Sequence, residues 1–162
     1  LDYGQVATRI LYGRSGLEPP EGDLYEIEGK AYPRDGMKKV LNALLYAAKP
    51  LTTWPRDTVD LFRNPVSRKH PPFKEVKDAL IEKHSQISSS FETGEGMRIM
   101  FLESQILIDV LETLRSEDIT ALPIHDAILV AKGHEPLAQK VMEDSFLKVT
   151  GVTAKVSLED QA

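Results

Sequence analysis

The sequence contains no cysteine at all, and this absence excludes several kinds of site. Without thiols the chain forms no disulfide bond and offers no thiolate ligand to zinc or an iron–sulfur cluster. It also lacks any apolar run long enough to span a bilayer, and we find no signal peptide. We therefore expect a cytoplasmic protein with no membrane partner.

Positive charge is also scarce, because 20 Lys and Arg residues stand against 25 Asp and Glu residues, which gives a formal net charge of −5. This balance argues against a broad basic surface that coats nucleic acid, although it leaves room for a local basic channel. A length of 162 residues predicts a single domain over residues 1–162. The chain begins at Leu1 rather than Met, so a processed piece of a longer protein is one alternative.

Hydrophobic periodicity predicts several helices, over residues 6–12, about 34–48, 73–86, 97–114 and 134–150. Residues 119–131 and 154–158 are typical of short strands. Strands near both ends with helices between them predict an α+β fold, in which a small antiparallel sheet packs against helices. Five of the ten prolines lie at about residues 50–72, so we predict an irregular insertion there.

Asp126 lies beside His125 inside an apolar run that extends from residue 122 to residue 130. An ionised carboxylate in such a run is costly unless a cation or several hydrogen bonds compensate for its burial. A His-Asp pair alone is more often a satisfied polar pair of the core than a functional site. A second carboxylate beside branched apolar residues, Asp2, and a cationic helix between the two favour a site.

That helix carries four side chains at four-residue spacing, namely Arg34, Lys38, Asn42 and Tyr46. They form one stripe roughly 18 Å long, which matches a nucleoside triphosphate laid along the helix. The two cations lie at the N-terminal end, where unpaired N–H groups and the helix dipole favour anions. An aromatic ring stands at the far end, where a base can stack. An ordinary solvated helix face is an equally good explanation of this stripe alone.

Three segments match, in the same order, the motifs of one known family. The run from Asp2 to Arg9, D-Y-G-Q-V-A-T-R, is similar to a strand motif D-Y-S-Q-I-E-x-R. The stripe matches three of the four places in a motif of Arg, Lys, an aromatic residue and Tyr. The sequence I-H-D-A, which ends at Ala127, is similar to V-H-D-E. Together they cover nearly the whole chain, which resembles a shortened palm and fingers core of family A DNA polymerases, the family of bacterial DNA polymerase I.

The resemblance implies template-dependent transfer of nucleotides from nucleoside triphosphates to a primer 3′-hydroxyl, with two Mg²⁺ (or Mn²⁺) ions. The metal ligands would be Asp2, Asp126 and the backbone carbonyl of Tyr3, and oxygen ligands suit a hard cation. Lys38 would bind the triphosphate and protonate the leaving pyrophosphate. The catalytic residues would then be Asp2, Asp126 and Lys38.

The resemblance also assigns contacts to the substrates. The nucleotide-binding residues would be Arg34, Lys38, Asn42, Tyr46 and Gln5. The residues that bind or support the primer and template would be His125, Arg9, Arg98 and Gln105, the last two in a helix with imperfect spacing. We also predict that Arg68 and Lys69, in the proline-rich insertion, contact primer or template phosphates. The alternative is a solvated surface loop.

The chain departs from the family at three positions. Ala7 replaces the Glu that crowds the sugar 2′ position, Ala127 replaces the second acidic residue of the last motif, and Asn42 replaces an aromatic residue. No thumb is recognisable, so a separate thumb-supplying segment or a replication protein is an expected partner. Two alternatives stay open. One is a catalytically retired palm that binds nucleic acid or protein, and the other is a primase or RNA polymerase-like enzyme with relaxed sugar selectivity.

Overall fold

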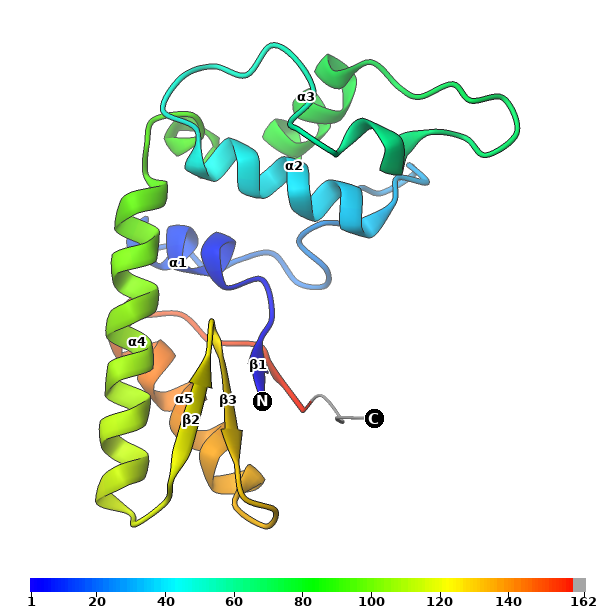
Figure 1. Cartoon of the computed structure of the whole chain (residues 1–162). Helices are drawn as coiled ribbons and strands as arrows, with labels where there is room; N and C mark the ends of the chain where they lie inside the picture. The colour runs from blue at the N-terminus through cyan, green and yellow to red at the C-terminus, as the bar shows by residue number, and fades with distance from the viewer. Residues whose placement is uncertain (159–162) are drawn as a thin grey trace. The chain divides into compact units, whose positions relative to one another are not determined.

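A computed structural model describes residues 1–158 and confirms the predicted α+β class (Figure 1). Over these residues the sheet has four strands in the order β2-β3-β1-β4, and all its pairings are antiparallel. The strands are β1 (Asp2–Tyr3), β2 (Ala121–Ile124), β3 (Ala127–Val130) and β4 (Val156–Ser157). The helices are α1 (Val6–Arg14), α2 (Arg34–Tyr46), α3 (Phe73–Lys83), α4 (Gly96–Ser116) and α5 (Glu135–Thr150).

The chain divides into two compact units. The sheet unit combines Leu1–Pro19 with the chain from Arg98 onward, and the helical unit is Pro20–Met97. The sheet unit therefore holds both acidic motifs, and the helical unit holds the stripe of α2. The single palm-like domain predicted over residues 1–162 stays a prediction.

The two-residue strand β1 lies in the interior of the sheet. Asp2 is paired with Ala127 of β3 and with Ser157 of β4. The amino group of Leu1 donates to the carbonyl of Ile128 at 3.0 Å, and the Ile128 N–H donates back to the Leu1 carbonyl at 2.9 Å. These bonds fix Asp2 beside the β2–β3 hairpin.

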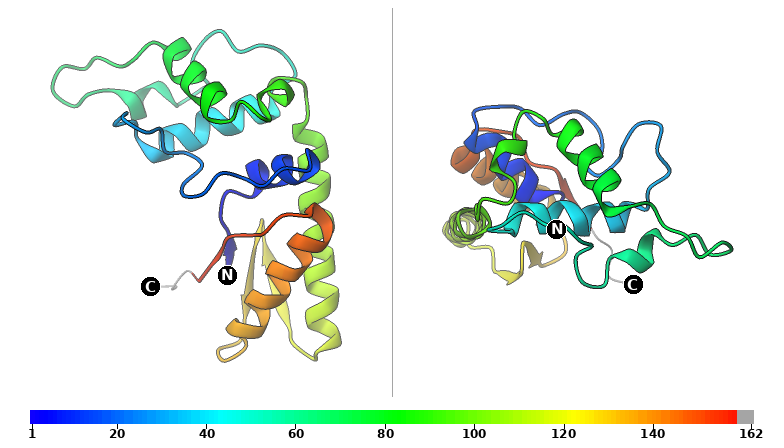
Figure 2. Two further views of the ribbon diagram at one scale, coloured as in Figure 1. Left: turned by 180° about the vertical axis from the view of Figure 1, so that it is seen from behind. Right: turned by 90° about the horizontal axis from the view of Figure 1, so that it is seen from above.

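Alternation along the strands separates two faces of the sheet. Tyr3 and Ile128 point to the buried face, which α5 covers (Figure 2). The Tyr3 hydroxyl donates to the Met142 carbonyl at 2.6 Å, and its ring lies 5.4 Å from that of Phe146. Burial, with smaller contributions from two nearby carboxylates, raises the pKa of Tyr3 well above its ordinary value. Asp2 therefore points to the opposite face.

That opposite face is open. Leu122 is paired with Leu129, and Ile124 with Ala127, so these side chains lie on the same face as Asp2. Leu122, Ile124 and Leu129 are all exposed. The sheet thus presents an uncovered surface next to the predicted acidic site.

The predicted helix at about 34–48 is confirmed as α2, although it ends at Tyr46. Ala47 is extended, and the N–H groups of Glu92 and Gly94 donate to the carbonyls of Leu44 and Ala47. These bonds satisfy carbonyls that the end of a helix leaves unpaired. Within the predicted insertion at residues 50–72, the one regular element is a short 3₁₀ helix, Val59–Phe62.

The helix α4 is the longest, with 21 residues, and its buried positions are Ile99, Ile106, Val110 and Leu114. These recur at helical spacing and form its core-facing stripe. Within residues 1–158, neither α4 nor any other helix is long and apolar enough to cross a membrane.

Candidate functional site

His125 and Asp126 form the two-residue loop of the β2–β3 hairpin, between the paired residues Ile124 and Ala127. His125 takes a φ of 55°, a left-handed conformation that Gly and Asn usually occupy in such loops. A non-glycine residue there costs on the order of 1 kcal/mol, and such strain often marks a functional position. His125 is exposed and Asp126 is half-buried.

Asp2 lies beside this loop, since its paired residue Ala127 directly follows Asp126. Residues 1–158 contain no group of three or more His, Cys, Asp or Glu side chains arranged to hold a metal. Mg²⁺ usually binds one or two carboxylates and takes its other ligands from phosphates and water. Binding of Mg²⁺ by Asp2 and Asp126 therefore stays a prediction. The separation of the two carboxylates stays a prediction.

A further carboxylate, Glu103 on α4, was not predicted from the sequence. It falls on the core-facing stripe, four residues after Ile99 and three before Ile106. Burial, and then the negative charge of Asp126, raise the pKa of Glu103 to about 7. Within residues 1–158 it has no hydrogen bond and no cationic partner. The sequence signal that could have identified Glu103 is an acidic residue on the apolar stripe of an amphipathic helix.

Glu103→Gln should make the stability of the chain less dependent on pH. The pKa of Glu103 rises from 4.5 to about 7 on folding, so the folded chain keeps a proton that the unfolded chain releases within this window. The free energy of unfolding should therefore fall as pH rises from about 4.5 to 7, on the order of 2 kcal/mol after allowance for partial exposure.

Thermal unfolding at pH 5 and pH 8 measures this effect. The native chain should lose a few degrees more in Tm than Glu103→Gln between the two pH values. Glu112→Gln, an exposed position on the same helix, is the matched control and should behave like the native chain. An identical pH dependence in the native chain and Glu103→Gln would contradict the inward position of Glu103.

At the N-terminal end of α2, Arg34 already forms an ion pair. Its Nε donates to Asp23 Oδ2 at 2.5 Å, and its guanidinium lies 5.2 Å from the ring centre of Tyr25. The other oxygen of Asp23 accepts from the Tyr25 N–H at 2.9 Å. A triphosphate that binds Arg34 must therefore compete with Asp23.

The rest of the stripe is more accessible. Lys38 is exposed, with no ion-pair partner among residues 1–158, and Asn42 is half-buried. Tyr46 is 39% exposed and rests on Gly96. A Cβ at Gly96 would lie 2.4 Å from a Tyr46 ring carbon and 2.9 Å from its Cα. Gly96 therefore allows the Tyr46 ring to lie against the start of α4.

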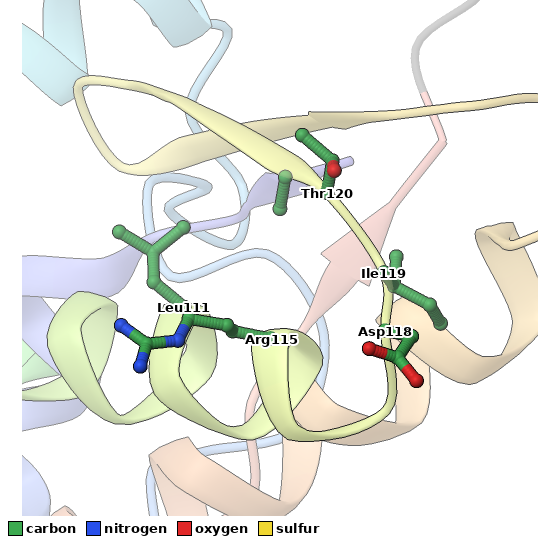
Figure 3. Close-up of a pocket in the computed structure, with 6 residues that line it drawn as sticks. Leu111, Arg115, Asp118, Ile119 and Thr120 are labelled. Atoms are coloured by element: carbon green, nitrogen blue, oxygen red, sulfur yellow. The ribbon is translucent and has the colours of Figure 1, made fainter.

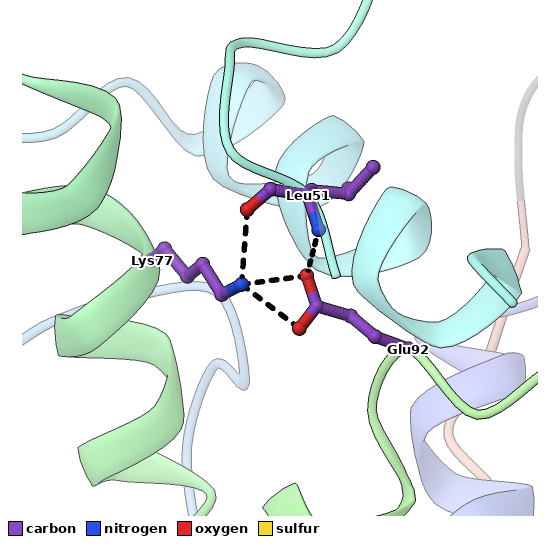
Figure 4. A network of polar contacts seen from close by, with 3 residues as sticks. All are labelled: Leu51, Lys77 and Glu92. Carbon is purple, nitrogen blue, oxygen red and sulfur yellow. Dashed lines mark hydrogen bonds and ion pairs between the residues drawn. The ribbon is translucent and has the colours of Figure 1, made fainter. Parts of the chain in front are cut away.

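A half-buried ion pair holds the C-terminal end of α2 (Figure 4). Lys77 Nζ lies 2.6 and 2.8 Å from the two carboxylate oxygens of Glu92 and donates to the Leu51 carbonyl at 3.0 Å. The Leu51 N–H donates to Glu92 at 2.6 Å, and the Glu92 N–H donates to the Leu44 carbonyl at 2.7 Å. The network joins α3, the segment after α2 and the last turn of α2, which carries Tyr46.

Other predicted residues have structural surroundings. Gln5 and Arg9 are buried in the sheet unit. Arg9 donates to the Thr153 carbonyl at 3.3 Å and, at a long 3.5 Å, to Gln5 Oε1. Gln5 has a φ of 61° at the start of α1. Arg9 therefore links α1 to the segment before β4.

The remaining predicted residues lie on exposed surfaces. Arg98 and Gln105 are exposed on α4, and Arg68 and Lys69 are exposed in the proline-rich insertion. Arg68 and Lys69 have no ion-pair partner within residues 1–158.

An open pocket of about 410 Å³ lies at the C-terminal end of α4 (Figure 3). It is lined by Leu111, Arg115, Asp118, Ile119, Thr120 and Ala121. Leu111 is eight residues beyond Glu103, about 12 Å along the helix. The pocket contains none of the predicted site residues.

No protein-family model, curated protein or solved structure matches this chain. The resemblance to family A polymerases therefore rests on the three motifs and their order.

Proposed function

We propose that this chain is a template-dependent nucleotidyltransferase, similar to family A DNA polymerases, that acts in the cytoplasm on primer–template nucleic acid and nucleoside triphosphates. The observation that carries the proposal is the set of carboxylates in the sheet unit. Asp126 is at the apex of a strained hairpin loop, and Asp2 is on β1, which pairs with β3 of this hairpin. Glu103 lies near enough to Asp126 for the charge of Asp126 to raise its pKa. Like charges at such positions are costly unless a cation offsets them.

In the proposed site, Asp2, Asp126 and the Tyr3 carbonyl would hold two Mg²⁺ or Mn²⁺ ions. When bound there, the ions would supply activation of the primer 3′-hydroxyl and positive charge beside the leaving pyrophosphate. Glu103 would be a further acidic group near Asp126. Gln5 and Arg9 would act indirectly, since Arg9 links Gln5 at the start of α1 to Thr153.

The stripe of α2 would bind the nucleotide. Lys38 lies in the N-terminal half of α2 and has no ion-pair partner within residues 1–158, so it can bind phosphate and donate a proton to the leaving group. Arg34 would exchange Asp23 for a phosphate oxygen. Tyr46, fixed against Gly96, offers a ring on which a base can stack, and Asn42 contributes polar atoms beside it.

His125, exposed at the hairpin apex, would contact the primer terminus, and Arg98 and Gln105 would contact the primer–template. A partner protein or a further segment would supply the function of a thumb. A net charge of −5 supports this dependence, because the chain lacks a broad surface that attracts nucleic acid.

A catalytically retired palm that binds nucleic acid or protein is the second candidate. The pairing of Arg34 with Asp23 and the loss of carboxylates at Ala7 and Ala127 favour it. Extension of a primed template with Mg²⁺ or Mn²⁺ distinguishes the two. Product formation supports the enzyme, and no product with either metal and either sugar favours the retired palm or a missing partner.

We expect weak selection between ribo- and deoxyribonucleotides. Ala7 is buried in α1 and offers no side chain that can crowd a 2′-hydroxyl. A pocket that lacks such a group rejects an added hydroxyl by no more than about 100-fold. Values of kcat/KM for the two sugars, measured on one template, should therefore agree within this factor or favour ribonucleotides. A much stronger preference for deoxyribonucleotides would mean that another residue excludes the 2′-hydroxyl, and it would count against a primase-like role.

A further inference from the structure

The proline-rich insertion concentrates positive charge in an otherwise acidic chain. Residues 50–72 carry four Lys or Arg and two Asp, a net of +2. Arg63 is paired with Asp60 at 3.1 Å. Three cations have no ion-pair partner among residues 1–158, namely Arg56, Arg68 and Lys69. These three are available to a polyanion.

A folded loop presents two of these cations. The N–H of Asn64 donates to the Lys69 carbonyl at 2.8 Å, and the Arg68 N–H donates to the Asn64 carbonyl at 2.9 Å. Asn64 Oδ1 accepts from the N–H groups of Val66 and Ser67, both at 2.9 Å. Arg68 takes a left-handed φ of 57°. The loop therefore has a defined shape, with the cations exposed on it, so little order is lost when they bind.

An aromatic cluster supports the base of this loop. The half-buried ring of Trp54 lies 4.7 Å from the ring of Phe62 and 5.5 Å from that of Phe73, both of which are buried. Its third neighbour, His70, is exposed and meets it edge-on at 5.8 Å. Trp54 and His70 thus offer aromatic surface directly beside Lys69.

The cluster is joined to the nucleotide-binding helix. A Cβ at Gly36 would lie 2.5 Å from the ring of Phe62, so Phe62 packs directly against the first turns of α2. Gly36 lies between Arg34 and Lys38. The aromatic and basic surface therefore adjoins the end of α2 that carries the proposed phosphate-binding cations.

We propose that Trp54, His70, Arg56, Arg68 and Lys69 form a binding surface for single-stranded nucleic acid. Phosphates would contact the three cations, and unstacked bases would stack on the exposed aromatic surface. Basic residues beside aromatic rings favour single strands over duplexes, because only unpaired bases offer their faces. The inference rests on the proposed function for its role, in which the strand is the unpaired part of the template.

Trp54 is the sole tryptophan of the chain, so its fluorescence reports this surface directly. Titration of the full chain with a short oligodeoxythymidylate should change the Trp54 emission, and binding should weaken steeply with salt. Lys69→Ala should reduce the slope of log affinity against log salt by about 0.7, and Arg68→Ala/Lys69→Ala by about twice that. Lys132→Ala, an exposed cation of the sheet unit, is the control and should leave the slope unchanged.

Several results would overturn the inference. They are an unchanged Trp54 emission, equal slopes for Lys69→Ala and the native chain, or equal affinity for a blunt duplex of the same length. Circular dichroism of each variant shows whether its fold is intact. If Arg68→Ala/Lys69→Ala binds normally while the native chain incorporates nucleotides, the inference fails and the proposed function stands.

Discussion

Asp126→Asn should reduce Mg²⁺-dependent nucleotide incorporation by about 10³-fold or more. The amide has nearly the shape of the carboxylate, but it carries no charge and is a poor ligand for a hard cation. Metal-ion stabilisation of developing charge contributes several kcal/mol, and about 4 kcal/mol corresponds to this factor. Since Asp126 is half-buried in a loop of two residues, the replacement should leave the hairpin itself intact.

Single-nucleotide addition to a primed template, at saturating substrate, measures the loss. Asp144→Asn is the matched control, because Asp144 is exposed on α5 and pairs with Lys140 of the same helix. It should keep nearly full activity. Thermal unfolding of both variants verifies the fold. Retention of more than about a tenth of the activity by Asp126→Asn would remove Asp126 from the catalytic site.

The largest loss of stability is expected for Lys77→Ala, about 3 kcal/mol in the free energy of unfolding. The side chains of Lys77 and Glu92 are only 16% and 13% exposed. Removal of the cation leaves the Glu92 carboxylate in a poorly hydrated site, where the Leu51 N–H is its remaining donor within residues 1–158. Glu92 also has a left-handed φ of 60°, which the network helps to maintain.

Chemical denaturation of Lys77→Ala and Lys74→Ala separates this effect from the general loss of a lysine. Lys74 lies one turn earlier on α3 and pairs with Asp78 on the exposed surface, so its replacement should cost less than about 1 kcal/mol. Equal losses in the two variants would show that the Lys77–Glu92 pair contributes no more than a surface pair. Because the network holds the last turn of α2, Lys77→Ala should also raise the KM for nucleotide.

Much of the fold could be predicted from local patterns. The apolar residues of α2 recur at helical spacing, and Pro33 precedes its first residue, so its start at Arg34 was predictable. Residues 119–131 were predicted to form short strands, and the structure places β2 and β3 there, joined as a hairpin. The predicted end of α2 was two residues too late. The N–H groups of Glu92 and Gly94 donate to carbonyls at the end of α2, and these two residues are distant in the sequence, so no local pattern shows the bonds.

The contacts around the candidate site were less predictable, because they join residues far apart in the sequence. Glu103 precedes Asp126 by 23 positions, and no local pattern shows that they lie near each other. The same holds for the pairs formed by Arg34 with Asp23 and by Lys77 with Glu92. The left-handed φ of His125 also has no signal in the sequence, since glycine is the residue expected in such a loop.

Binding of Mn²⁺ decides most directly whether Asp2 and Asp126 hold a divalent cation, since it needs no template, primer or partner protein. Free Mn²⁺ can be followed by electron paramagnetic resonance as the full chain is titrated with the ion in the presence of a nucleoside triphosphate, and the same titration of the triphosphate alone is subtracted. The native chain and Asp144→Asn should bind Mn²⁺ with equal affinity, and Asp126→Asn should bind it at least about 10-fold more weakly. Equal Mn²⁺ affinity in the native chain and Asp126→Asn would contradict a metal site at the hairpin.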